Sequence, residues 1–112
     1  MKYGIQISHK LSIDGGFKIS HYGTIVIAGK SIIGKNFDIR QGTTIGVTDK
    51  GSPIIGDNVF VGANSCIIGK IKIGNNVVIG AGSVVVKDVP NNCTVAGNPA
   101  KIIKSNNRIE NV

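Results

Sequence analysis

The sequence predicts an all-β protein whose chain winds as a solenoid of short parallel strands. The main observation is an aliphatic side chain at every sixth position, as at Ile67, Ile73 and Ile79. The second is the Gly or Asn that recurs between these positions and suits tight turns. The third is composition: apolar residues make up 41% of the chain and aromatic residues 4%, with no Trp. Layers of Ile and Val must therefore form the interior.

The aliphatic positions, which we call anchors, fall into three runs with a spacing of six inside each run. They are Ile7, Ile13 and Ile19; Ile27, Ile33, Ile39 and Ile45; and Ile55, Val61, Ile67, Ile73, Ile79 and Val85. A fixed short period is the sequence signature of a solenoid. If three units make one triangular coil with strands about 4.8 Å apart, the thirteen anchors predict slightly over four coils.

A second small or apolar side chain stands two residues before most anchors, as expected for an inward-facing strand with a period of two. These residues are Phe37, Thr43, Val59, Ser65, Ile71, Val77 and Ser83. Gly often follows the anchor directly, as at Gly34, and Asn or Gly often stands three residues after it, as at Asn36. Both residue types tolerate left-handed backbone, so they predict corners between the strands.

The spacing between consecutive anchors is interrupted twice, lengthening to eight across residues 20–26 and to ten across residues 46–54. Because extra residues cannot enter a stacked interior, both segments should bulge outward at corners, where solenoids often bind ligands. If each coil contains three anchors, one for each side of the triangle, the two bulges fall at different corners. A threefold arrangement of subunits could bring one bulge against the other.

The formal charge of +7 would attract phosphate, whatever molecule carries it. The lysines, however, are scattered singly among expected turns, as at Lys35, Lys50 and Lys70. We find no basic helix and no aromatic platform for stacking bases, so solvated turns or a small phosphorylated ligand are favoured over nucleic acid. The sequence also has no apolar run of the length a signal peptide or membrane helix requires. We expect a cytoplasmic protein with no membrane insertion.

Few residues could support metal or nucleophilic chemistry. Cys66 and Cys93 lie in different sequence surroundings and are expected to be reduced thiols. Since there are only 2 histidines, a metal site built on three imidazoles is excluded and we expect no metal. The sequence has no nucleophile elbow, phosphate loop or paired-carboxylate motif.

His21, in the first interruption, is the best candidate for a general base, because imidazole accepts a proton near neutral pH. The alternative is a turn histidine that bonds a local carbonyl group. His9 falls between Ile7 and Ile13, at an ordinary corner, and we expect it to be structural.

Four segments together carry a resemblance to a known family. They are His21–Ile27, Gln41–Gly46, Gly80–Val85 and Val95–Lys101. In this order they resemble the left-handed β-helix domain of serine-acetyltransferase-like hexapeptide acyltransferases. The resemblance covers residues 3–103 and leaves 104–112 as an exposed C-terminal tail. It implies a left-handed coil, acetyl-CoA as the acetyl donor, and a homotrimer with active sites between subunits.

The resemblance also implies roles for individual residues. His21 would take a proton from an acceptor hydroxyl, whose oxygen attacks the thioester while backbone N–H groups stabilise the oxyanion. The groove for the pantetheine arm would be lined by the backbone at Gly46, Val47 and Thr48, with Ala63 and Ala81. The candidates for binding the phosphates of the coenzyme are Lys87, Lys101 and Lys104.

The sequence departs from serine acetyltransferases around the acceptor. Gln6 stands where they place an Asp that orients and charge-stabilises the histidine. Gln6 could orient an imidazole but could not offset its positive charge, and Asp14 is an alternative partner. The second interruption offers only Asp49 and Lys50 in place of the Arg-His pair that binds the carboxylate of the amino acid. The chain is closer to short relatives found among bacterial surface-polysaccharide genes.

We therefore expect an acetyl-CoA-dependent O-acetyltransferase that acts on a hydroxyl of a sugar or polysaccharide precursor. One alternative is a serine O-acetyltransferase of cysteine biosynthesis. Another, of a different class, is a non-catalytic solenoid that binds CoA or a partner protein. Gln6 favours this last alternative.

Overall fold

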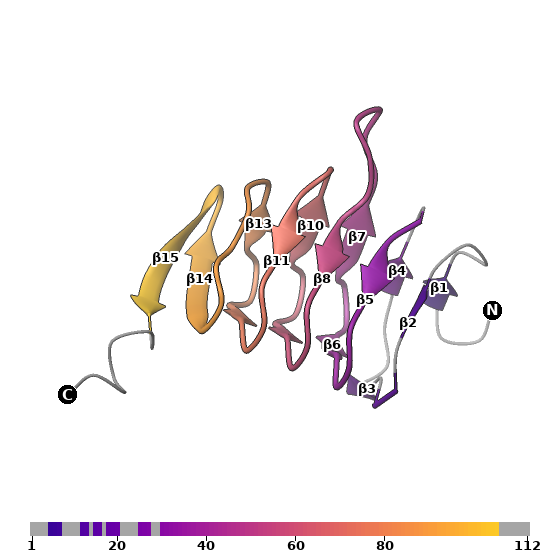
Figure 1. Ribbon diagram of the computed structural model, residues 1–112, viewed down its shortest axis with the longest axis horizontal. Coiled ribbons are helices and arrows are strands. Elements are labelled where there is room, and N and C mark those ends of the chain that lie inside the picture. The colour runs from indigo at the N-terminus through magenta and orange to yellow at the C-terminus, as the bar shows by residue number, and fades with distance from the viewer. Residues whose placement is uncertain are drawn as a thin grey trace.

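The protein is a triangular coil of short strands (Figure 1). The computed structural model describes residues 5–7, 12–13, 15–16, 18–20, 25–27 and 30–105, with side chains for residues 15–16, 27 and 30–105. Within these ranges the chain forms fifteen strands and no helix. The described residues accordingly contain no helix that is long and apolar enough to cross a membrane.

The strands form three sheets, one for each side of the triangle. The first sheet contains β1 (Ile5–Ile7), β4 (Ile25–Ile27), β7 (Thr44–Gly46), β10 (Cys66–Ile68) and β13 (Val84–Val85). The second contains β2 (Ser12–Ile13), β5 (Ile32–Ile33), β8 (Ile54–Ile55) and β11 (Lys72–Ile73). The third contains β3 (Lys18–Ser20), β6 (Asp38–Arg40), β9 (Phe60–Val61), β12 (Val78–Ile79), β14 (Cys93–Gly97) and β15 (Ala100–Ser105).

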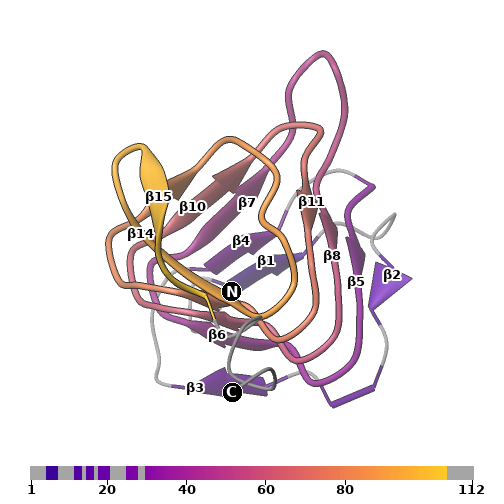
Figure 2. The same cartoon turned by 60° about the vertical axis from the view of Figure 1, so that its left-hand side comes forward.

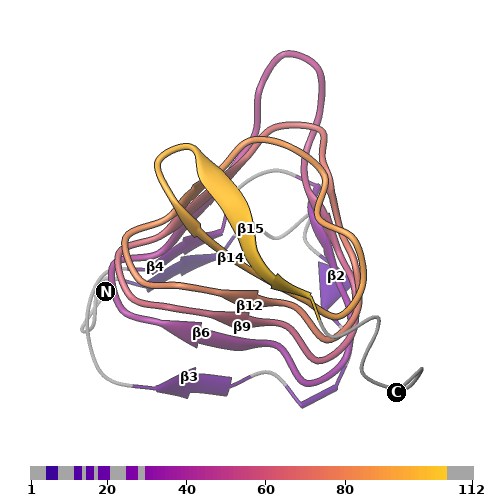
Figure 3. The same cartoon turned by 90° about the vertical axis from the view of Figure 1, so that its left-hand side faces the viewer.

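The coil is left-handed. Figure 3 views the solenoid from its C-terminal end, and there the chain runs clockwise from β4 through the second sheet to the third while it advances toward the viewer. The strands of successive coils pair in parallel, with anchor beside anchor, as in Ile45 beside Ile67 and Ile67 beside Val85. The predicted all-β left-handed parallel solenoid is thus confirmed.

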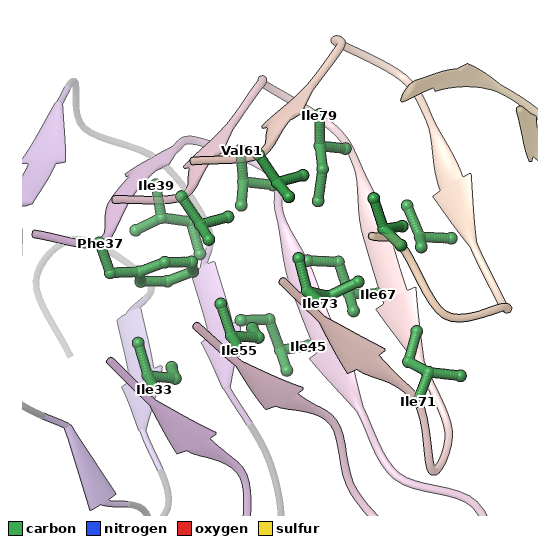
Figure 4. Close-up of a cluster of buried hydrophobic side chains, with 14 of the residues drawn as sticks. Ile33, Phe37, Ile39, Ile45, Ile55, Val61, Ile67, Ile71, Ile73 and Ile79 are labelled. Atoms are coloured by element: carbon green, nitrogen blue, oxygen red, sulfur yellow. The ribbon is translucent and has the colours of Figure 1, made fainter. Parts of the chain in front are cut away.

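The interior is built as the six-residue spacing predicts, because each of the thirteen anchors lies in one of the strands β1 to β13. Every anchor from Ile27 onward is at most 2% exposed. Figure 4 shows these Ile and Val side chains stacked in layers, with Phe37, the largest fully buried side chain, at one side of the stack beside Ile33 and Ile39. The residues two positions before the anchors also face inward, and even Thr43, Ser65 and Ser83 are at most 1% exposed.

Three corners connect the sheets. Corner 1 joins the first sheet to the second and comprises, among the described residues, 30–31, 47–53, 69–71 and 86–88. Corner 2 joins the second sheet to the third and comprises residues 34–37, 56–59, 74–77 and 90–92. Corner 3 joins the third sheet to the first and comprises residues 41–43, 62–65 and 80–83.

Corner 2 explains the recurring Asn of the sequence. Asn36, Asn58, Asn76 and Asn92 have φ angles of 57° to 61°, in the left-handed region that Asn tolerates. Their side chains form a row of hydrogen bonds along the solenoid, in which the amide of one Asn donates to the next over 3.0 to 3.3 Å. The Gly after the anchor permits this stacking, since a Cβ at Gly34 would lie 2.7 Å from the backbone of Gly56. The turn residues therefore permit the close stacking of successive coils.

The regular spacing changes at a third place that we did not expect. Val89 forms a parallel bridge with Ile73 and takes the next anchor position in the second sheet, only four residues after Val85. Val95 follows in β14, beside Ile79. Both side chains are buried, at 6% and 2% exposure, and together they complete a fifth coil.

The solenoid ends in a hairpin. β14 and β15 pair antiparallel across the cis Asn98–Pro99 bond, and β15 lies across the C-terminal end of the coil (Figure 3). β15 runs to Ser105, so ordered structure extends slightly beyond residue 103. The division into a domain of residues 3–103 and a tail of residues 104–112 stays a prediction.

Candidate functional site

The second interruption forms a tight turn at corner 1 that projects well beyond the other corners (Figure 2). Thr48 and Gly51 exchange two backbone hydrogen bonds of 3.0 and 3.1 Å, which leaves Asp49 and Lys50 at the tip. The Thr48 hydroxyl also accepts a 3.2 Å hydrogen bond from the N–H of Lys50. The bulge is therefore a defined hairpin turn.

The turn is held against the next coil by two close approaches. The Thr48 side chain lies over Gly69, where an added Cβ would be 3.5 Å from the Thr48 methyl. A Cβ at Gly51, whose φ is +145°, would lie only 3.1 Å from the Cβ of Lys70. A side chain at residue 51 would displace Lys70, so the glycine keeps the turn in contact with the coil.

A cavity of about 280 Å³ opens beside this turn. Three lysine or threonine side chains line it, together with aliphatic groups from the two following coils. The polar residues are Thr48, Lys50 and Lys70, and the aliphatic ones include Ile68 and Val86. A larger hollow of about 490 Å³ lies near Lys72 and Pro90, and none of the predicted site residues lines it.

The predicted groove residues occupy two corners. Gly46, Val47 and Thr48 lie where β7 enters corner 1, and Val47 is 45% exposed. Ala63 and Ala81 lie at corner 3, which precedes β10 and β13. The two groups thus lie at opposite ends of the strands in the first sheet. The N–H of Thr48 already donates to Gly51, and Gly46 is paired with Ile68 in the β7–β10 ladder. Of these three residues, Val47 is therefore the one whose backbone N–H is outside both the turn and the ladder.

The outer face of the first sheet lies between these two groups. Thr44, Cys66 and Val84 are neighbours in the β7, β10 and β13 register, and all three are partly exposed. This surface is narrow and uncharged, unlike the outer face of the third sheet, where Asp38 and Arg40 form an ion pair. Cys66 is a free thiol there. An uncharged face is suitable for the amide and methylene groups of a pantetheine arm.

The predicted phosphate-binding lysines do not form one cluster. Lys87 is exposed at corner 1, beside Val86 of the cavity. Lys101 and Lys104 are exposed on β15, where they pair with Ala96 and Thr94 of β14. Their assignment to the coenzyme stays a prediction.

The residues predicted to act in proton transfer lie at the margin of the described chain. His21 and Asp14 are outside the described residues, and Gln6 is described only by its backbone, in β1 beside Val26 of β4. Because β3 ends at Ser20 in the third sheet and β4 begins at Ile25 in the first, the first interruption connects these two sheets. The second interruption lies between the first sheet and the second, so the two interruptions belong to different corners, as predicted. No group of three or more His, Cys, Asp or Glu side chains occurs among the described residues.

Sequence reasoning did not place Lys70 beside the second interruption, where it lines the cavity. The signal was present in the repeat: Ile67 occupies the same sheet as Ile45, so the residues after both anchors must reach the same corner. Counting anchors in threes would have placed Lys70 beside the second interruption.

The comparisons with known proteins agree with this architecture. The profile of the family described as bacterial transferase hexapeptide (six repeats) matches residues 52–87. Serine acetyltransferase 1 of Arabidopsis thaliana, a chloroplastic protein, is 48% identical over 105 residues, which are 90% of this chain and 33% of the relative. The chain thus spans about a third of the length of this relative.

Solved structures give the same result. The crystal structure of Neisseria gonorrhoeae serine acetyltransferase superposes with a TM-score of 0.84 at 42% identity, covering 91% of this chain and 41% of that one. A structure of the gonococcal enzyme in complex with serine matches with a TM-score of 0.81 at 44% identity, over 88% of this chain and 42% of that one. A serine acetyltransferase in complex with CoA has a TM-score of 0.81 at 38% identity, over 88% and 41%.

Proposed function

Because this chain has the repeats and the coil of a serine-acetyltransferase-like hexapeptide-repeat acyltransferase, we propose that it transfers an acetyl group from acetyl-CoA to a hydroxyl group. The observation that carries the proposal is the 48% identity to a serine acetyltransferase across 90% of the chain. The solved relative in complex with CoA supports the choice of donor.

The relatives change the acceptor that we expect. From the missing Arg-His pair we expected a sugar, with serine as the alternative. The similar proteins are serine acetyltransferases, and one was solved in complex with serine, so serine is the better-supported acceptor. The association with polysaccharide genes stays a prediction.

The reaction needs a base, an oxyanion site and a leaving group. In the proposed mechanism His21 removes the proton from the serine hydroxyl as its oxygen attacks the thioester carbonyl carbon. The N–H group of Val47, which is outside both the β7–β10 ladder and the Thr48–Gly51 turn, stabilises the negative oxygen of the tetrahedral intermediate. When the intermediate collapses, the C–S bond breaks and the proton on His21 passes to the CoA thiolate. Gln6 orients the imidazole without offsetting its positive charge.

We propose that these groups meet between subunits of a homotrimer. His21 belongs to the connection between the third and first sheets, whereas Gly46 and Val47 lie at the other end of the first sheet. A threefold arrangement that sets corner 3 of one subunit against corner 1 of the next would complete the site. Coenzyme placed in this boundary could contact Ala63 and Ala81 on one side and Thr48 on the other.

An acceptor panel tests the proposed reaction. Purified protein with acetyl-CoA is expected to release free thiol in the presence of L-serine, and to release it much more slowly with nucleotide sugars. Efficient turnover of a sugar without turnover of serine would show that the acceptor assignment is wrong. Binding of CoA by calorimetry without thiol release from any acceptor would identify the chain as a non-catalytic solenoid.

A further inference from the structure

Two lysine side chains give the cavity at corner 1 a positive charge, which has no role in the proposed mechanism. Lys50 reaches it from the tip of the turn, and Lys70 reaches it from the following coil. No acidic residue lines the cavity. The ion pair found among the described side chains joins Asp38 and Arg40 on the third sheet, so neither lysine has a carboxylate partner in the described part of the chain.

The packing of the turn places the Lys70 stem and the Lys50 backbone beside the cavity. The Lys70 stem lies along Gly51, with its Cβ, Cγ and Cδ 3.1 to 3.3 Å from where a Cβ of residue 51 would lie. The backbone of Lys50 is fixed by the hydrogen bond from its N–H to Thr48. Two lysines from different coils are therefore directed to one cavity, which also has apolar walls formed by Ile68 and Val86.

We propose that Lys50 and Lys70 bind the carboxylate of the acceptor amino acid and so select it over an uncharged sugar. The proposal rests on the proposed function, and it supplies the carboxylate contact that the sequence lacks as an Arg-His pair. Thr48 lines the cavity and follows Val47, whose backbone N–H would bind the thioester oxygen. A carboxylate held there places an acceptor close to the donor. Lys70 lies in the next coil, outside the second interruption. In this proposal it is a specificity-determining residue, although the sequence of the interruption does not contain it.

Binding measurements test this inference without requiring turnover. By calorimetry, the wild-type protein with CoA present should bind L-serine at least tenfold more tightly than L-serinamide, which lacks the carboxylate, since charged hydrogen bonds contribute about 1.5–3 kcal/mol. Lys70→Gln and Lys50→Gln should each weaken serine binding by about tenfold and leave serinamide binding almost unchanged. Lys35→Gln, which removes the same charge at corner 2, is the matched control and should bind both ligands as the wild type does.

Three results would overturn the inference. Equal affinity of the wild type for serine and serinamide would show that no carboxylate is bound. An equal effect of Lys70→Gln on both ligands would show a structural role. If Lys50→Gln and Lys70→Gln weakened CoA binding and left serine binding unchanged, the cavity would be assigned to the coenzyme phosphates. By contrast, normal serine discrimination without thiol release would contradict the proposed acetyl transfer and leave the carboxylate site intact.

Discussion

Replacing His21 with alanine is expected to lower kcat for acetyl transfer by about 10²-fold or more, the contribution of a positioned general base. The acceptor hydroxyl is a weak nucleophile until a base removes its proton, and His21 and His9 are the only histidines of the chain. KM for acetyl-CoA should change little, because the donor is bound by other groups. Thiol release at saturating L-serine and acetyl-CoA measures the effect.

His9→Ala is the matched control for this experiment, since His9 stands at an ordinary corner in the sequence. It should keep near-normal kcat. If His21→Ala kept near-normal kcat as well, His21 would have no part in the mechanism. A loss of activity in both variants would indicate damage to the fold and would be seen as a lower unfolding temperature.

Replacing Phe37 with alanine is expected to have the largest effect on stability, about 3–5 kcal/mol in the free energy of unfolding. Phe37 is 0% exposed and lies among Ile33, Ile39 and Ile55 of the core. Its removal leaves a cavity that the stacked coils cannot close, because backbone hydrogen bonds between successive strands within each sheet fix their spacing. Urea unfolding followed by circular dichroism at constant protein concentration measures the change.

Phe60→Ala provides the comparison for Phe37→Ala. Phe60 lies on the outer side of β9, partly exposed, with the Arg40 guanidinium 4.9 Å from its ring centre. Its loss should cost about 1 kcal/mol, from one exposed cation–π contact and partial burial. Equal losses from the two substitutions would mean that Phe37 does not lie in the core as described.

The interior could be predicted from the sequence because it depends on spacing alone. An anchor such as Ile45 must lie beside Ile67 if three units make one coil, and no other information is needed. Val85 was predicted to begin a fifth coil, but its continuation through Val89 and Val95 was not, because only Val86, Lys87 and Asp88 separate Val85 from Val89. Because this corner is shorter than the others, the six-residue spacing ends at Val85 although the solenoid continues.

The candidate site could be predicted only in part. The count of anchors correctly placed the interruptions at different corners, and the Gly-rich composition indicated turns there. The sequence could not show that Thr48 and Gly51 close a hairpin turn, or that Lys70 packs along it. The first contact is made by backbone groups inside an irregular loop, and the second joins a side chain of one coil to the loop of another. A repeat pattern carries no information about either.

The central claim is that the two interruptions form one acetyl-transfer site across a subunit boundary, and subunit complementation tests it most directly. Gly46→Val is the partner variant for His21→Ala: a Cβ at Gly46 would meet only the Ile68 side chain, at 3.7 Å, so the protein should fold while the valine obstructs the thioester. Each variant alone should be nearly inactive. Co-expressed in equal amounts, they should assemble mixed trimers in which about a quarter of the boundaries join an intact His21 to an intact Gly46.

Recovery of about a quarter of wild-type thiol release in the purified mixture is therefore the result that we predict. A mixture that is no more active than the separate variants, although light scattering shows mixed trimers, would contradict the account.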